Sequence, residues 1–143
     1  MQNTEVIMSR IKPLSPTQLA DFKPMFDVLE NTMGYIPNNL LSMAHWPELL
    51  TAFGGIGATI LQSGELDRGL KQLVAMVASA AHGCNYCQAH TSHSAHKLGV
   101  SQEKVEATFE FESSSLFSDA ERAALKLAWH AALQPNASSD SDF

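Results

Sequence analysis

Apolar residues recur at intervals of three and four in nearly every long segment of this chain. Between residues 15 and 32 they stand at Leu19, Phe22, Phe26 and Leu29, a spacing that places them on one face of an α-helix. No segment has an alternating β-strand pattern that rises above this background. The sequence therefore predicts an all-α fold, a bundle of about six or seven helices around a shared core.

Capping and breaking residues divide the chain into these helices. Ser15 with Gln18, Asp67, and Ser118 with Glu121 have the side chains that cap helix N-termini, while glycine and proline end helices. The predicted helices cover residues 15–32, a short segment from 38 to about 46, 47 to 63, 67 to 82, 85–98, a short segment from 101, and 118–133.

Length and composition favour one domain. A chain of 143 residues that is 45% hydrophobic is long enough for one core and short for two. We expect residues 1–134 to form a single helical domain and the Ser-, Asp- and Asn-rich residues 135–143 to be disordered. The formal charge of -6 and the scattered lysines and arginines argue against nucleic acid as a partner.

The N-terminal residues lack the cationic start and the apolar run of a signal peptide. The longest apolar stretches, near residues 49–61 and 70–81, are shorter than the roughly 20 residues that cross a bilayer. The sequence therefore predicts a cytoplasmic protein without a membrane span.

The two cysteines of the chain, Cys84 and Cys87, stand three positions apart at the predicted start of a helix. A helix N-terminus and nearby imidazoles lower the pKa of a thiol from about 8.5. Residues one turn apart share a face and can close a disulfide. We interpret the pair as a redox couple. The alternative is two buried, inert thiols, since free cysteine packs as a small apolar side chain.

His90 follows Cys87 by three residues, so it shares that face and is a candidate acceptor for the thiol proton. His93 and His96 continue the spacing, but each step of three turns back around the helix by about 60°, so we expect His96 to be solvated. The alternatives are a packed, hydrogen-bonded His90, a structural His93 and a loop position for His82.

Two other readings of the cysteine pair are less favoured. Four ligands from Cys84 to His93 span about 13 Å along a helix, so all four cannot surround one zinc ion, although a site with two or three of them and another chain stays open. A thioredoxin-like domain needs strands before the helix, and none is predicted. We expect no cofactor and no metal.

Two stretches together resemble the alkylhydroperoxidase AhpD and carboxymuconolactone decarboxylase family. The first is Gly34-Tyr35-Ile36-Pro37-Asn38 followed by Ala44-His45-x-Pro47-Glu48-Leu49-Leu50 and Phe53. The second runs from Leu66-Asp67-Arg68 to Gly83-Cys84-Asn85-Tyr86-Cys87-Gln88-Ala89-His90-Thr91. The resemblance covers roughly residues 25–133.

The resemblance implies an all-helical fold that assembles into dimers, trimers or hexamers, and a peroxidase branch marked by the cysteine pair. In that branch Cys87 would attack the peroxide and Cys84 would resolve the intermediate, whereas the helix dipole alone favours Cys84. A lipoyl-type or thioredoxin-type dithiol would reset the enzyme.

The chain departs from the family pattern in three places. Gln72 stands where the best-studied members have a glutamate, and an amide cannot shuttle a proton at neutral pH. Tyr86 replaces a histidine found in some members, and Thr91 occupies the place of the family histidine. A rewired proton relay would use Gln72, Tyr86, His93 and a carboxylate such as Glu110 or Glu112, although surface solvation is the simpler role for both glutamates.

The leading hypothesis is a thiol-dependent peroxidase that protects against hydroperoxides. Its catalytic residues would be Cys87, Cys84 and His90. The alternatives are a redox-sensing or scaffold oligomer that has lost turnover with Gln72, and a lactone decarboxylase, which would leave the cysteine pair without a role.

Overall fold

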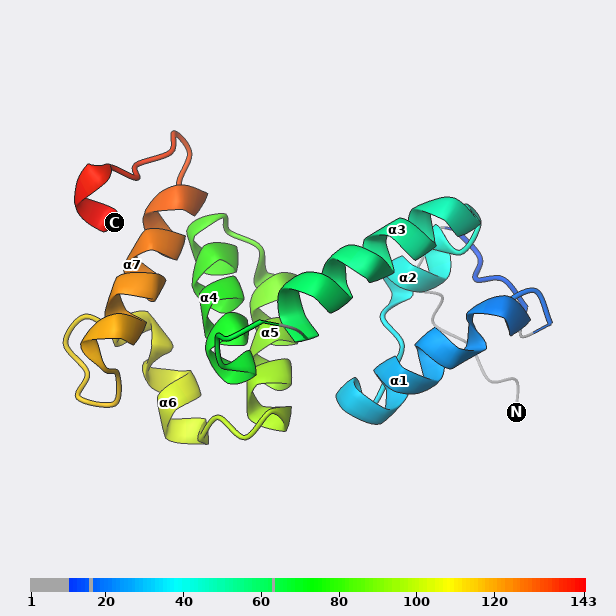
Figure 1. The fold of residues 1–143 in the computed structure, drawn as a ribbon, viewed down its shortest axis with the longest axis horizontal. Coiled ribbons are helices and arrows are strands. Elements are labelled where there is room, and N and C mark those ends of the chain that lie inside the picture. Colours follow the sequence, from blue (N-terminus) through cyan, green and yellow to red (C-terminus); the bar gives the residue numbers. More distant parts are fainter. Residues whose placement is uncertain (1–10, 16, 63) are drawn as a thin grey trace, which may run out of the picture. The chain divides into compact units, whose positions relative to one another are not determined.

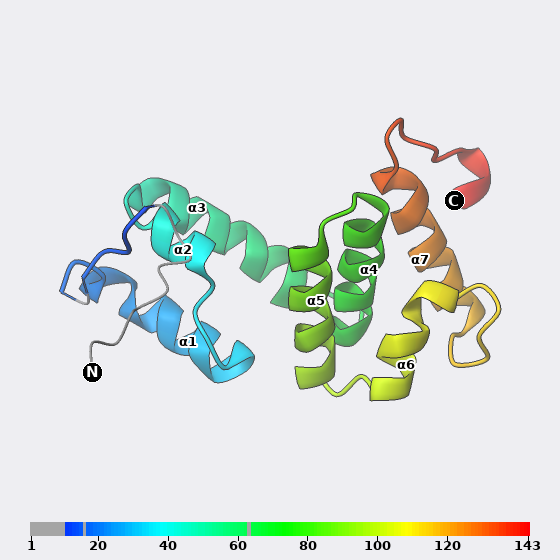
Figure 2. The same cartoon turned by 180° about the vertical axis from the view of Figure 1, so that it is seen from behind.

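The computed structural model describes residues 11–15, 17–62 and 64–143, and within them every regular element is a helix. This confirms the predicted all-α fold class. Figures 1 and 2 show the course of the chain from two opposite sides. The α-helices of the described residues are α1 (Lys23–Met33), α2 (Asn38–Met43), α3 (Pro47–Gly57), α4 (Arg68–Ala81), α5 (Asn85–Lys97), α6 (Gln102–Glu106) and α7 (Asp119–Ala132).

The chain divides into two compact units, residues 1–62 and 63–143, and each is described by itself. The prediction of one domain over residues 1–134 is not tested by this division and stays a prediction. In the first unit, α1, α2 and α3 enclose a small core of Phe26, Leu40, Ala44 and Leu50. The last turn of this unit, Ala58–Gln62, widens into a π-helix, which the apolar spacing did not predict.

The first predicted helix begins later than its capping residues suggested. Ser15 and Gln18 do interact, since the backbone N–H of Ser15 donates to Gln18 Oε1 at 3.1 Å. The regular helix α1 nevertheless starts at Lys23, after a 3-10 turn over Ala20–Phe22. Pro24 explains the delay, because a proline lacks the N–H for a helical bond and clashes with the carbonyl four residues earlier.

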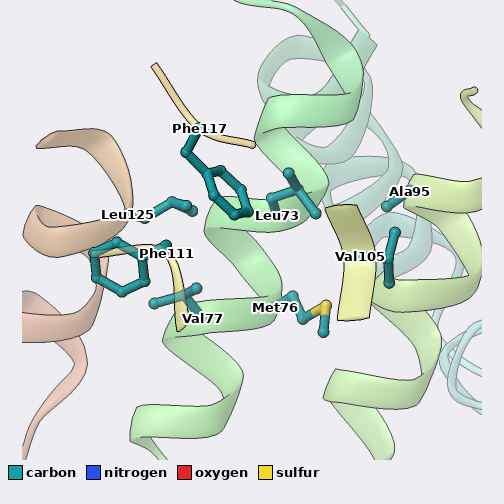
Figure 3. Close-up of a cluster of buried hydrophobic side chains, with 8 residues drawn as sticks. All are labelled: Leu73, Met76, Val77, Ala95, Val105, Phe111, Phe117 and Leu125. Atoms are coloured by element: carbon teal, nitrogen blue, oxygen red, sulfur yellow. The ribbon is translucent and has the colours of Figure 1, made fainter. Parts of the chain in front are cut away.

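The second unit is built around α4, which lies between α5 and α7 (Figures 1 and 2). Its buried core joins four helices and the loop before α7, and its members are Leu73, Met76, Val77, Ala95, Val105, Phe111, Phe117 and Leu125. Figure 3 shows Phe111 and Leu125 beside Val77 on the α7 side of α4, and Met76 turned toward Val105. This core holds α5, which begins at the cysteine pair, against α4.

The predicted caps of the second unit are confirmed. Asp67 Oδ1 accepts from the N–H of Leu70 at 2.9 Å at the start of α4. Ser118 and Glu121 form a reciprocal capping box at the start of α7. Gly83 ends the α4 segment with a φ of 74°, a left-handed conformation that favours glycine. The chain therefore turns sharply just before Cys84.

The last residues pack against α7. Asp140–Asp142 form a 3-10 turn, and the Asp142 carboxylate accepts a hydrogen bond from His130 Nδ1 at 2.9 Å and pairs with Lys126 Nζ at 3.2 Å. The expected disorder after residue 134 stays a prediction. Among the described helices, none combines the length and the apolar character needed to cross a bilayer.

Candidate functional site

The cysteine pair lies at the N-terminus of α5, as its position after Gly83 predicts. Cys84 is the N-cap residue, with extended backbone, and its Sγ accepts a hydrogen bond from the N–H of Cys87 at 3.2 Å. Sulfur thus takes the role that a Ser or Asp oxygen has in other helix caps. The helix N-terminus stabilises negative charge, so this bond favours the thiolate of Cys84 in the reduced protein.

Cys84 and Cys87 are joined by a disulfide, with their Cα atoms 5.3 Å apart. This separation lies within the usual range for disulfides, so α5 needs no rearrangement to close the bond. Both cysteines are half-buried, and Asn85 and Tyr86 between them are exposed. The first turn of α5 therefore holds the pair at the edge of the fold.

His90 is half-buried one turn after Cys87 on α5. Desolvation by burial lowers the pKa of its imidazole, and the nearby His93 lowers it further. A lowered pKa keeps His90 neutral at pH 7, the form that can accept a proton. The ring of Tyr86 stacks on His90, with centroids 6.2 Å apart and planes inclined by 14°. Tyr86 thus restricts the orientation of the imidazole.

Two of the three positions at which the chain departs from the family pattern are buried, while the third, Tyr86, is exposed. Gln72 on α4 and Thr91 on α5 are each 8% exposed. The Thr91 hydroxyl donates to the backbone carbonyl of Cys87 at 2.8 Å, an i to i-4 bond typical of threonine within helices. Thr91 therefore supports the backbone beneath the cysteine pair.

The remaining predicted residues lie on the surface. His93 and His96 are exposed on α5, and Glu110 is exposed at the end of the 3-10 turn Ala107–Glu110. His82 is exposed, and its Nδ1 lies 3.2 Å from the carbonyl oxygen of Ala132 on α7. In the described part of the chain, no cluster of three or more His, Cys, Asp and Glu side chains is placed to hold a metal ion.

A cavity of about 260 Å³ opens on the second unit beside α5. Helices α4, α5 and α7 and the turn before Phe111 form its walls. The residues that line it are Val77, Ala80, Gln88, Thr108, Phe109, Phe111 and Trp129. Sequence reasoning missed this cavity, because its aromatic residues are far from the cysteines along the chain.

The chain matches one known protein family and is similar to two solved structures. The profile of the carboxymuconolactone decarboxylase family matches residues 47–129. Two crystal structures of the debrominase Bmp8 are similar to the chain, each with a TM-score of 0.86. A Cys-to-Ala variant in complex with 2,3,4-tribromopyrrole is 34% identical over 96% of this chain and 73% of that one. The apo form is 36% identical over 94% and 73%. No curated protein matches the chain.

Proposed function

Because the chain belongs to the carboxymuconolactone decarboxylase family, we propose that it is an enzyme whose Cys84 and Cys87 thiols together deliver two electrons to a small electrophilic substrate. The observation that carries this proposal is the disulfide at the α5 N-terminus. Two half-buried thiols that close a bond without moving the helix are suited to cycle between dithiol and disulfide. We propose a hydroperoxide as the substrate.

In the proposed cycle Cys87 is the attacking thiol, because His90 stands one turn away as a neutral proton acceptor. The thiolate sulfur bonds to the terminal peroxide oxygen, the O–O bond breaks, and the alkoxide leaves as an alcohol with the proton held by His90. Cys87 becomes a sulfenic acid.

Cys84 then attacks the sulfenic sulfur. The S–S bond forms, and the displaced hydroxide takes a proton and leaves as water. The sum is one hydroperoxide and two thiols giving one alcohol, one water and one disulfide. An external dithiol, of the lipoyl or thioredoxin type, then attacks the Cys87 sulfur, because the hydrogen bond from the Cys87 N–H makes Cys84 the better leaving thiolate.

Steady-state turnover separates this enzyme from a redox sensor. With dihydrolipoamide or reduced thioredoxin in excess, we expect many equivalents of hydroperoxide to be consumed per chain. A sensor would form one disulfide and stop. Consumption limited to one equivalent with every dithiol would contradict the proposal of catalysis.

Reductive debromination is a second candidate, favoured by the similarity to the debrominase Bmp8 over nearly all of this chain. The same pair of thiols would convert one aryl bromide into the arene, bromide, a proton and the disulfide. Reduced protein mixed with a brominated pyrrole should then release one bromide for each disulfide formed. Bromide release without peroxide consumption would favour this candidate over the first.

Replacing Gln72 by glutamate is expected to raise peroxidase turnover about a hundredfold, the lower end of the range for one added acid-base group. Gln72 is 8% exposed, and burial raises the pKa of a carboxyl toward neutrality, where it can both accept and donate a proton. The kcat with hydroperoxide and excess dithiol measures the effect. Gln72→Met, of similar shape and without charge, is the control; an equal rise in both variants would contradict a proton-relay role.

We also propose that the protein works as a homo-oligomer. Helix α3 and the following turn expose Leu49, Phe53, Ile56 and Ile60, which are between 40% and 60% exposed and recur at helical spacing along one face. We expect light scattering to give a mass of at least two chains, each of 15.5 kDa. Ile56→Asp should lower that mass; a wild-type mass near 15.5 kDa would contradict the proposal.

A further inference from the structure

The cavity beside α5 adjoins the cysteine pair through Gln88. Gln88 follows Cys84 by four residues, so the two side chains share one face of the helix. Four residues correspond to about 6 Å along the helix axis. The α5 wall of the cavity is therefore formed by Gln88, one residue after Cys87 and one helical turn after Cys84, and neither cysteine is among the residues that line the cavity.

Three of the residues that line the cavity are aromatic. Phe109 and Phe111 come from the turn between α6 and α7, and Trp129 comes from α7. Phe111 belongs to the buried core, and Figure 3 shows it beside Val77, another lining residue. Rings held in this way favour stacked or edge-to-face contacts with a further aromatic ring. The wall is thus suited to a flat, apolar molecule.

The polar groups of the cavity allow one anchor for such a ligand. The Thr108 hydroxyl already donates to the carbonyl of Lys104 at 3.0 Å. The Gln88 amide nitrogen donates to Asn85 Oδ1 at 3.5 Å, a long and weak hydrogen bond that a ligand can replace. Small-molecule sites commonly combine apolar walls with a few polar groups that fix orientation. Gln88 supplies that group here.

The volume of the cavity limits the size of the ligand that it can hold. A cavity of about 150 Å³ holds one benzene ring, and this one has a volume of about 260 Å³. We propose that the cavity binds a single aromatic ring carrying a polar substituent, with the ring against Trp129 and Phe109 and the substituent on Gln88. One consequence of this inference rests on the proposed function. If the protein reduces hydroperoxides, the cavity makes an aromatic hydroperoxide a better substrate than hydrogen peroxide.

Binding can be measured without catalysis. Cumyl alcohol, the reduced form of cumene hydroperoxide, does not react with thiols and is the probe. The disulfide form of a Trp46→Phe variant retains Trp129 as its single tryptophan, so quenching of its fluorescence reports on the cavity. We expect saturable quenching by cumyl alcohol and at least fivefold weaker quenching by tert-butanol at equal concentration, roughly the contribution of a buried aromatic contact.

Two variants test the location of the site. Ala80→Leu fills the cavity from α4, and Phe109→Ala removes a ring that is 51% exposed and outside the core cluster. Both should weaken cumyl alcohol binding by about tenfold or more, as expected for loss of a packed contact. Phe143→Ala, which removes a 93% exposed ring elsewhere on the same unit, should leave binding unchanged. Absent quenching, or equal affinity in all variants, overturns the proposal.

A kinetic comparison separates this inference from the proposed function. With reduced protein, Ala80→Leu should slow disulfide formation by cumene hydroperoxide about tenfold and leave the rate with hydrogen peroxide unchanged. Saturable cumyl alcohol binding in a protein that reduces neither peroxide would refute the proposed function and support the binding site. Equal loss with both peroxides, together with unchanged cumyl alcohol binding, would refute the binding site alone.

Discussion

Replacing Cys87 by serine is expected to reduce peroxidase turnover by at least about a thousandfold, the scale seen when a catalytic nucleophile is removed. The hydroxyl of serine is far less acidic than a thiol, and it cannot form a sulfenic acid or a disulfide. In the proposed cycle the first chemical step then has no nucleophile. Turnover with excess dithiol and labelling by dimedone, which traps sulfenic acids, measure the loss.

Replacing Cys84 by serine should differ from Cys87→Ser in the trapping of a sulfenic acid, not in the loss of turnover. Turnover with a dithiol should fall to a similar extent, because no resolving thiol remains. A single equivalent of hydroperoxide should still convert Cys87 into a sulfenic acid that dimedone traps on nearly every chain. Labelling of Cys87→Ser with none of Cys84→Ser would reverse the assignment, making Cys84, the cysteine at the N-cap, the attacking thiol.

Replacing His90 by glutamine is expected to slow the peroxide step about a hundredfold, the lower range for a general base. Burial lowers the pKa of His90 below 6.5, so the imidazole is neutral above that pKa and protonated below it. The rate of the wild-type protein relative to His90→Gln should therefore increase as pH rises through a pKa below 6.5 and be constant above it.

The neighbouring histidines provide the controls for this result. His93→Gln removes the neighbouring imidazole whose electrostatic interaction helps to lower the His90 pKa, so the pH-dependent limb should move to higher pH. His96→Gln alters an exposed residue of the same helix and should leave both rate and pH profile unchanged. Stopped-flow measurements of disulfide formation between pH 4.5 and 8 report all three variants. A profile of His90→Gln identical to wild type would contradict the proton-acceptor role.

The helices of the second unit could be predicted because their ends depend on local chemistry. The Asp67 cap, the Ser118 capping box and the left-handed Gly83 act within four residues along the chain, so their signals are visible in sequence. The start of α1 lies later than the capping residues predict, because Pro24 interrupts helical hydrogen bonding within the apolar pattern. The π-helix Ala58–Gln62 that follows α3 has no comparable local signal.

In the candidate site, too, the features set by local spacing could be predicted and those set by side-chain orientation or distant packing could not. The closeness of Cys84 and Cys87 results from helical spacing and was expected. The Tyr86 stack on His90 and the cap formed by the Cys87 N–H and Cys84 Sγ depend on side-chain orientations that spacing does not determine. The aromatic cavity brings Trp129 to the same space as Phe109 and Phe111, about 20 positions earlier, and as Gln88 on α5, which a single sequence does not reveal.

The central claim, a two-electron cycle of Cys84 and Cys87, is tested most directly by titrating the fully reduced protein with hydroperoxide. Intact mass and free-thiol count are followed together after each addition. We expect one equivalent to remove both thiols and lower the mass of each chain by about two hydrogen atoms, as one intramolecular disulfide requires. Two free thiols and an unchanged mass after excess hydroperoxide would contradict the account.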